Sequence, residues 1–312
     1  MLTLFTTGKP FRGHSGVIQR NALRSWTFLH PDVEIILFGD EEGAAEAARA
    51  LAIRHVPHTE RNENGRPLLN CLFDKANEIA RHGILCYSNC DIILLPDFCR
   101  ALEQVKRSHE QFLMVGRRWD TNITQPIDFT RSDWAEQTRE RAFIANEQRS
   151  GDWIDYFAFH LGLYHKKIPP LLLGRVYWDN WLVWKAAKEG ATVVDVSDTV
   201  VAIHQNHDYG YHPQGQAGVW AGEEARLNFL LVGSCWHLKT IESATLRLTE
   251  RGIVPVHVPW HVVVRRQWDT LRLCFRMRLW HPLLNRSRPF RHALGIKWEK
   301  IVPAFFRRTS QR

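Results

Sequence analysis

The sequence has no long apolar run. Its most apolar stretches, 227–238 and 252–264, go without charge for only 12 and 13 residues, whereas a helix that spans a bilayer needs about 20. The start, MLTLFTTGKP, has no basic segment ahead of an apolar one, so it does not have the pattern of a signal peptide. We therefore expect no transmembrane helix and a cytoplasmic location.

Cysteine is sparse, and other marks of specialised architectures are missing. The six cysteines of the 312-residue chain include no C-x₂-C pair, which argues against a disulfide scaffold. Internal repeats, low-complexity segments and Gly/Ser-rich linkers are also lacking. The hydrophobic and charged fractions, 45% and 24%, are those of a globular protein. We expect one continuous domain over 1–255 and an extension over 256–312.

Acidic residues are scarce in that extension. Residues 260–312 contain 13 Lys and Arg against 2 Asp and Glu, which leaves 28 and 31 for residues 1–259. An enzyme that acts on nucleic acid more often carries its basic charge around the active site, so we expect no nucleic-acid partner. The basic tail instead indicates contact with an anionic surface.

Part of the tail has the pattern of an amphipathic helix. Apolar residues recur at spacings of four and three with arginines beside them: Val264, Trp268, Leu271, Phe275 and Leu279, flanked by Arg265, Arg272 and Arg276. Two interpretations stay open. The helix packs on the body with solvated arginines, or it lies on an anionic membrane and makes the protein peripheral on the inner face of that membrane.

The first part of the chain alternates strand and helix signals. Apolar strand-like runs occupy 2–6, 33–38, 53–56, 84–88 and 92–95, and helical spacing of apolar residues separates the first four. Asp40 is placed to cap the helix expected at 41–52. Further strands are expected at 112–116, 153–159, 192–196 and 200–204, and further helices at 133–148, 179–189 and 221–231. This order predicts an α/β domain with a mostly parallel sheet flanked by helices, whose ligands bind beyond the carboxyl ends of the strands.

Asn89 and Asp91 interrupt two apolar strands at such an end. A carboxylate there is costly unless it is solvated, hydrogen-bonded or bound to a cation. Chance also produces many N-x-D triplets, so it is the position between two buried strands that makes this pair a functional candidate.

Asp179 follows a Gly-Arg turn and lies among aromatic residues. It is either the N-cap of a helix or a general base, since partial desolvation raises the pKa of a carboxylate and suits proton abstraction from a hydroxyl.

His204, His207 and His212 fall within nine residues after an apolar strand. With the polar residues between them they suggest contact with a metal or a diphosphate. The spacing lacks the cysteines or the H-E-x-x-H helix of an autonomous zinc site.

Four motifs in this order point to a family: YSNCDIILLPDF, DYFAFHLGLY, GRVYWDNWLVWKA and AIHQNHDYGYHP. They resemble the GT-A-fold (Rossmann-like) glycosyltransferases, in particular an uncharacterised group of nucleotide-diphospho-sugar transferases from bacterial and plant genomes. The resemblance covers about residues 1–235.

The resemblance implies a site. Asp91 with Asn89 takes the place of the D-x-D motif that holds a divalent cation and the sugar nucleotide, although Asn stands where Asp is usual. Asp179 resembles the catalytic base, Gly162 the glycine loop ahead of the acceptor, and His204 or His207 the histidine that completes the metal site. Oxygen ligands with an imidazole suit Mn²⁺ or Mg²⁺.

Other residues are candidates for substrate contacts on the same grounds. For the base, ribose and phosphates these are Thr6, Thr7, Arg20 and Asp40, and Arg66 and Lys75 are cationic candidates. For the sugar or acceptor they are Arg117, Arg118, Trp119, Asp120, Asp155, Trp178 and Asn180.

The sequence thus favours a metal-assisted glycosyltransferase that moves a sugar from a nucleoside diphosphate to a hydroxyl of a saccharide or lipid-linked acceptor, with inversion if Asp179 is the base. Two alternatives remain. A sugar nucleotidyltransferase would have an N-terminal Gly-rich loop, which Gly8–Gly13 resembles only loosely. Such an enzyme would release pyrophosphate. A non-catalytic membrane or nucleic-acid adaptor would use the basic tail.

Overall fold

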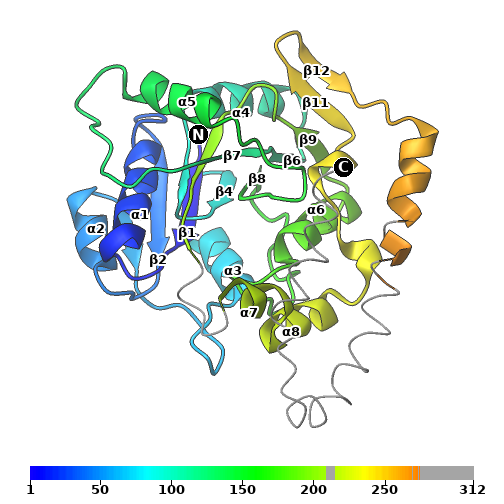
Figure 1. Ribbon diagram of the computed structural model, residues 1–312, viewed down its shortest axis with the longest axis horizontal. Coiled ribbons are helices and arrows are strands. Elements are labelled where there is room, and N and C mark those ends of the chain that lie inside the picture. Colours follow the sequence, from blue (N-terminus) through cyan, green and yellow to red (C-terminus); the bar gives the residue numbers. More distant parts are fainter. Residues whose placement is uncertain (209–214, 269, 273, 275–312) are drawn as a thin grey trace.

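The computed structural model describes residues 1–208, 215–268, 270–272 and 274 (Figure 1). At its centre lies a nine-stranded sheet in the order β12-β11-β9-β6-β8-β4-β1-β2-β3. Most neighbouring strands run parallel, whereas β8 is antiparallel to β4 and β6, and β12 to β11. The prediction of a mostly parallel α/β sheet is confirmed.

The predicted strands and helices form, and the structure adds elements that the patterns did not predict, at Asp97–Ser108, Arg118–Thr121, Gly215–Ala221, Leu246–Thr249 and Gly252–Pro255. The strands of the large sheet are β1 Thr3–Thr7, β2 Glu34–Phe38, β3 Arg54–Val56, β4 Ile84–Ser88, β6 Phe112–Val115, β8 Tyr156–His160, β9 Thr192–Asp195, β11 Leu246–Thr249 and β12 Gly252–Pro255. The helices are α1 Gly13–Trp26, α2 Ala44–Ala50, α3 Leu69–Ile79, α4 Asp97–Ser108, α5 Trp134–Ala145, α6 Trp178–Lys188, α7 Gly215–Ala221 and α8 Glu223–Val232.

Helices cover both faces of the sheet because its strands are apolar on both sides. Along β1, Leu4 packs in a core with α1, α2 and α4, whereas Phe5 packs in a second core with α3 and α6. Alternate residues of a strand point to opposite faces, so a near-continuous apolar run is what a sheet buried on both faces requires.

A second, three-stranded sheet contains β5 Ile92–Ile93, β10 Ala202–Gln205 and β7 Arg118–Thr121. Its register sets His204 opposite Ile92 on one side and opposite Asp120 on the other. The indole N–H of Trp26 donates to the carbonyl of Ile92 at 2.9 Å, which joins α1 to this sheet. The small sheet therefore carries His204 to the turn that holds Asp91.

Two predicted helix caps are wrong. Helix α2 begins at Ala44 with Gly43 at the N-cap position, where a positive φ of 79° suits glycine, and Asp40 instead pairs with Arg61 at 3.1 Å. Helix α6 has Tyr177 at its N-cap position, so Asp179 lies inside the first turn.

The tail is described only in part. Residues 260–268 and 270–272 are helical, in the region where the amphipathic pattern predicts a helix. Phe275, Arg276, Leu279 and the rest of 275–312 lie outside the described residues, as does His212. Within the described ranges, no helix is both long and apolar enough to cross a membrane.

Candidate functional site

A cleft of about 770 Å³ opens at the carboxyl ends of β1 and β4. Its first wall comes from the N-terminal half and includes Thr7, Lys9, Arg61 and Arg66. Its second wall comes from residues 152–155, 173–180 and 219–220. The sequence-predicted residues that line it are Thr7, Arg66, Asn89, Asp91, Arg118, Asp155, Trp178, Asp179, Asn180, His204 and His207. The parallel-sheet rule therefore located the cleft correctly.

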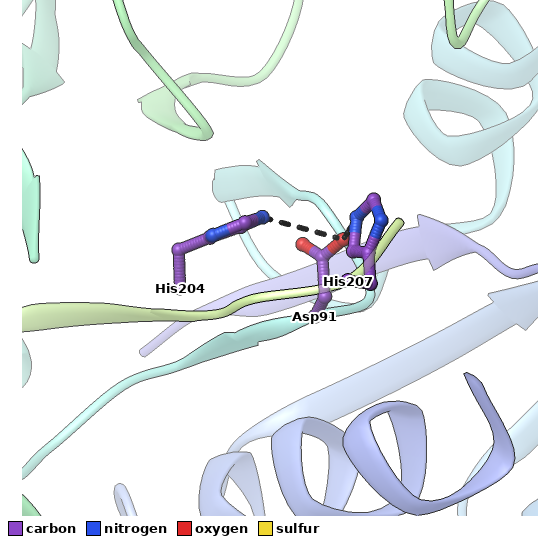
Figure 2. Close-up of side chains that lie close together, drawn as sticks. All are labelled: Asp91, His204 and His207. Atoms are coloured by element: carbon purple, nitrogen blue, oxygen red, sulfur yellow. Dashed lines mark hydrogen bonds and ion pairs between the residues drawn. The ribbon is translucent and has the colours of Figure 1, made fainter. Parts of the chain in front are cut away.

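Asp91, His204 and His207 form a cluster at the base of the cleft. One ligand atom from each lies within 4.8 Å of the others, and the Oδ2 atom of Asp91 is 3.1 Å from Nε2 of His207 and 4.0 Å from Nε2 of His204. Figure 2 shows the two imidazoles on either side of the carboxylate. Three donors that converge in this way can hold one divalent cation.

The second nitrogen of each imidazole lies close to an oxygen atom. The Nδ1 atom of His207 is 2.8 Å from the carbonyl oxygen of Asp208, and Nδ1 of His204 is 3.3 Å from Oδ1 of Asp120. Without a cation, Nε2 of His207 donates to Asp91. With a cation bound, a proton on each Nδ1 would leave both Nε2 atoms free as ligands, which is the usual arrangement of metal-binding histidines. The other oxygen of Asp91, Oδ1, is buried and has no hydrogen-bond partner among the residues that the structure describes. One carboxylate and two imidazoles fit a divalent transition-metal cation such as Mn²⁺ better than Mg²⁺, which prefers oxygen ligands.

Positive groups surround Asp91. Burial raises the pKa of this carboxyl, but the hydrogen bond from His207 and the charges of His204, His207 and Lys9 outweigh burial and hold the pKa well below its usual range. The ammonium of Lys9 lies 3.4 Å from Nε2 of His207. Asp91 is thus ionised at neutral pH and available as a ligand.

Asn89 is engaged in a different contact. Its amide Nδ2 donates to Oδ1 of Asp155 at 2.6 Å, and its Oδ1 accepts from the hydroxyl of Tyr87 at 3.1 Å. The side chain therefore joins the turn after β4 to Asp155, in the loop that precedes β8. In this arrangement Asn89 positions the turn and does not join the cluster.

Arg118 connects the second wall to the cluster. This buried guanidinium donates to Asp155 at 2.5 Å and to Asp120 at 2.8 Å, and Asp120 also accepts from Arg149 at 2.6 Å. Because Asp120 faces His204 as well, the arginines fix the carboxylate that orients an imidazole of the cluster. Of these two predicted substrate contacts, Arg118 lines the cleft and Asp120 does not.

Asp179 lines the second wall in the first turn of α6. Burial raises the pKa of its carboxyl to about 7, and the negative charges of Asp155 and Asp152 add to the rise against the N–H groups of Asn180 and of Asp179 itself. A carboxyl with this pKa accepts protons efficiently near neutral pH.

Two predicted residues lie away from the cleft. Gly162 follows β8, which runs antiparallel to β4 with Ile84 opposite His160. The turn at Gly162 therefore lies at the amino end of β4, and the cleft lies at its carboxyl end. An acceptor loop at Gly162 does not fit this placement. Lys75 pairs with Glu78 on the exposed side of α3. The remaining predicted residues outside the lining are Thr6, Arg20, Asp40, Arg117, Trp119 and Asp120.

The sequence interpretation missed several residues of the cleft: Lys9, Asp152, Trp153, Arg175 and Trp220. Lys9 directly follows the first strand, so the rule that placed Asp91 could have found it. Trp153, Arg175 and Trp220 lie in loops or in a short helix, where no spacing pattern marks a side chain for the cleft.

No protein-family model and no curated protein matches the chain. Among solved structures it is similar to residues 1–349 of TarS from S. aureus, with 11% identity over 65% of this chain and 60% of that one and a TM-score of 0.44. Glucosyl-3-phosphoglycerate synthase from Mycobacterium tuberculosis, in complex with Mg²⁺ and UDP, has 13% identity over 74% and 78% (TM-score 0.46). Mannosyltransferase PcManGT from Pyrobaculum calidifontis, in complex with GDP-Man and Mn²⁺, has 12% over 68% and 58% (TM-score 0.41).

The chain spans about three fifths of that TarS fragment and 36% of a longer TarS chain. Its α/β sheet, mostly parallel with helices on both faces, agrees with the fold class predicted from the sequence. The likenesses concern the fold alone, and the function proposed below rests on this chain's own side chains.

Proposed function

We propose that the protein is a metal-assisted glycosyltransferase that moves a sugar from a nucleoside diphosphate to a hydroxyl group. The observation that carries this proposal is the presence, in one cleft, of the Asp91–His204–His207 cluster and of Asp179 with a pKa raised to about 7. A cation site and a proton acceptor are the two groups that such a transfer requires.

The first wall supplies donor contacts. Lys9 and Arg66 bring positive charge to the cleft, which suits a diphosphate. Thr7 ends β1 beside them, where parallel α/β sheets bind nucleotides. A cation held by the cluster would offset the charge that develops on the departing diphosphate, more strongly in the transition state than in the bound substrate.

The second wall supplies the base. Asp179 accepts the proton of the acceptor hydroxyl, and the oxygen forms a bond to the anomeric carbon. The bond from that carbon to the diphosphate oxygen breaks, and its electron pair leaves with the diphosphate. Attack from the face opposite the leaving group inverts the configuration at the anomeric carbon.

A thermal-shift panel tests the donor site. We expect one of UDP, GDP, CDP and ADP to raise the melting temperature with Mn²⁺ and not with EDTA, because a ligand at 100 times its dissociation constant stabilises by about 2.7 kcal/mol. Absence of a shift with all four nucleotides would contradict the proposal. Release of pyrophosphate from a nucleoside triphosphate and a sugar phosphate would favour a nucleotidyltransferase instead.

We also propose that the tail helix docks the enzyme on an anionic membrane. Its less exposed residues, 262, 266, 270 and 274, recur every four positions, and Arg266 joins the body through Glu242 at 3.1 Å. An adjacent stripe is solvent-exposed: Trp260 (77%), Val263, Val264, Trp268 (60%) and Leu271. In Figure 1 this orange helix stands at the edge of the molecule.

The charge of this helix fits a lipid surface. Arg265 and Arg272 are exposed and lie beside the apolar stripe in the helical sequence, and lipid headgroups would meet such positive groups on a helix that lies in the interface. Tryptophan is favoured at that depth because its ring is apolar and its N–H is polar.

Vesicle cosedimentation tests the docking. We expect the full chain to bind phosphatidylcholine vesicles that contain phosphatidylglycerol, and to release them as salt rises. Replacing Trp260 and Trp268 together with Ala should weaken binding about tenfold or more, whereas Trp236→Ala, at an exposed site elsewhere, should not. Binding of the double variant equal to that of the wild type would refute docking through this helix.

A further inference from the structure

The second wall of the cleft presents two indole rings to the cleft. Trp153, in the loop ahead of β8, and Trp220, on α7, both line the cleft and are half-buried. Their ring centroids are 5.3 Å apart and their planes meet at 53°. The rings therefore form a wedge whose aromatic surface lies on the side of the cleft that also holds Asp179.

The other large groups of this wall are engaged elsewhere. Trp178 is buried and packs edge-on against Tyr87 at 5.5 Å, and Tyr177 packs against the ring of Phe229 at 5.6 Å. The amide of Asn180 donates to the carbonyl of Lys239. The indoles of Trp153 and Trp220 line the cleft on this wall.

Two arginine side chains lie over the ring of Trp153 and hold it in position. The guanidinium of Arg118 lies 4.8 Å from its ring centroid and that of Arg149 lies 5.6 Å away. Both arginines are bound to Asp120, so the ring rests on a network of ion pairs and is oriented before a ligand arrives. Such preorganisation lowers the cost of binding.

The charges of this wall favour a neutral ligand. Its cations are paired with carboxylates: Arg118 with Asp155 and Asp120, and Arg175 with Glu224. Asp152 and Asp179 line the same wall, and their carboxylate oxygens can accept hydrogen bonds from the hydroxyl groups of a ligand. A phosphate or carboxylate would meet these negative charges, whereas the C–H groups of a sugar ring, which carry a small positive charge, would meet the negative faces of the indoles.

We propose that the Trp153–Trp220 wedge is the acceptor subsite, and that it binds a pyranose ring of an uncharged saccharide. The C–H face of the ring stacks on the indoles, and its hydroxyls donate to Asp152 and Asp179. This assignment rests on the proposed function, because it places the nucleophilic hydroxyl beside the base. It excludes small phosphorylated or carboxylated acceptors.

Saturation-transfer NMR tests the subsite without any donor or turnover. The probes are methyl glucoside, methyl galactoside, methyl mannoside, methyl N-acetylglucosaminide and cellobiose, with glucose 6-phosphate and 3-phosphoglycerate for comparison. We expect at least one neutral probe to bind with strongest saturation on the C–H protons of one ring face. Trp220→Ala should weaken its binding about tenfold or more, since stacked aromatic surface is lost.

Two matched variants show whether the loss of binding comes from the missing aromatic ring at Trp220. Trp220→Phe keeps a ring and should bind within about threefold of the wild type, and Trp236→Ala removes an exposed indole outside the cleft and should bind as the wild type does. Unchanged binding by Trp220→Ala, or binding of the anionic probes alone or of none, would overturn the subsite. The donor panel reports separately on the proposed function, because it reads nucleotide binding at the opposite wall.

Discussion

Asp179→Asn is expected to slow sugar transfer by about 10²–10⁴-fold while nucleotide binding with metal stays as in the wild type. The amide keeps the shape of the side chain and removes its ability to take a proton. Asp179 lies on the second wall, apart from the cluster of Asp91, His204 and His207, so the donor site is left intact. Transfer is measured as release of nucleoside diphosphate, and donor binding as the thermal shift.

The same variant should change two pH profiles. In the wild type, transfer rises as the pH passes through about 7, where Asp179 ionises, whereas the residual rate of the variant lacks this step. Because burial raises the folded pKa above the unfolded value of 3.8, ionisation destabilises the fold as pH increases from about 4 to about 7. The variant should therefore gain melting temperature relative to the wild type over that range and keep the gain above it.

Asp152→Asn is the matched control for the base. Asp152 lies on the same wall and its negative charge helps to raise the pKa of Asp179. Removal of this charge should shift the midpoint of the pH profile to lower pH, and at saturating acceptor it should leave the maximal rate within about tenfold; weaker acceptor binding would appear in KM. Full transfer by Asp179→Asn would show that another group is the base. A rise in the rate near pH 7 that persists in Asp179→Asn would show the same.

Much of the fold could be predicted because local pattern and tertiary packing agree. The run ILCYS predicted β4, since a strand buried on both faces must be apolar throughout. The same argument placed Asp91 at the edge where the cleft opens. By contrast, β7 escaped prediction because its inward-facing residues, Arg118 and Asp120, are charged. Their mutual ion pair replaces the apolar contacts on which strand periodicity depends.

Direction and pairing were harder to predict than element type. A strand's orientation in the sheet follows from its long-range partner, and β8 pairs antiparallel with both neighbours. That reversal carries Gly162 away from the site. The role of Asn89 also depends on a distant partner. Its amide N–H donates to Asp155 at 2.6 Å, which the carboxylate of an Asp could not do. A second Asp there would set two negative charges against each other, which explains the departure from the D-x-D pattern physically.

Asp91→Asn is expected to abolish the part of nucleotide binding that depends on Mn²⁺. The change keeps the size of the side chain and removes its charge between two imidazoles that lie 3.1 and 4.0 Å away. Loss of an orienting group around a metal site typically costs about 10–100-fold in affinity, and loss of the charged ligand should cost about 100-fold or more. Titration of the nucleotide with and without Mn²⁺ measures the difference.

Asp120→Asn separates ligation from orientation. This variant keeps Asp91, His204 and His207 and weakens the contact that holds Nδ1 of His204 at 3.3 Å, so we expect a smaller loss, of about 10–100-fold. Circular dichroism and melting temperature in EDTA check that both variants are folded, which matters because Asp120 also binds two arginines. If Asp91→Asn binds the nucleotide with Mn²⁺ as tightly as the wild type does, the cluster is not the cation site, and the diphosphate must be held by the positive side chains of the first wall instead.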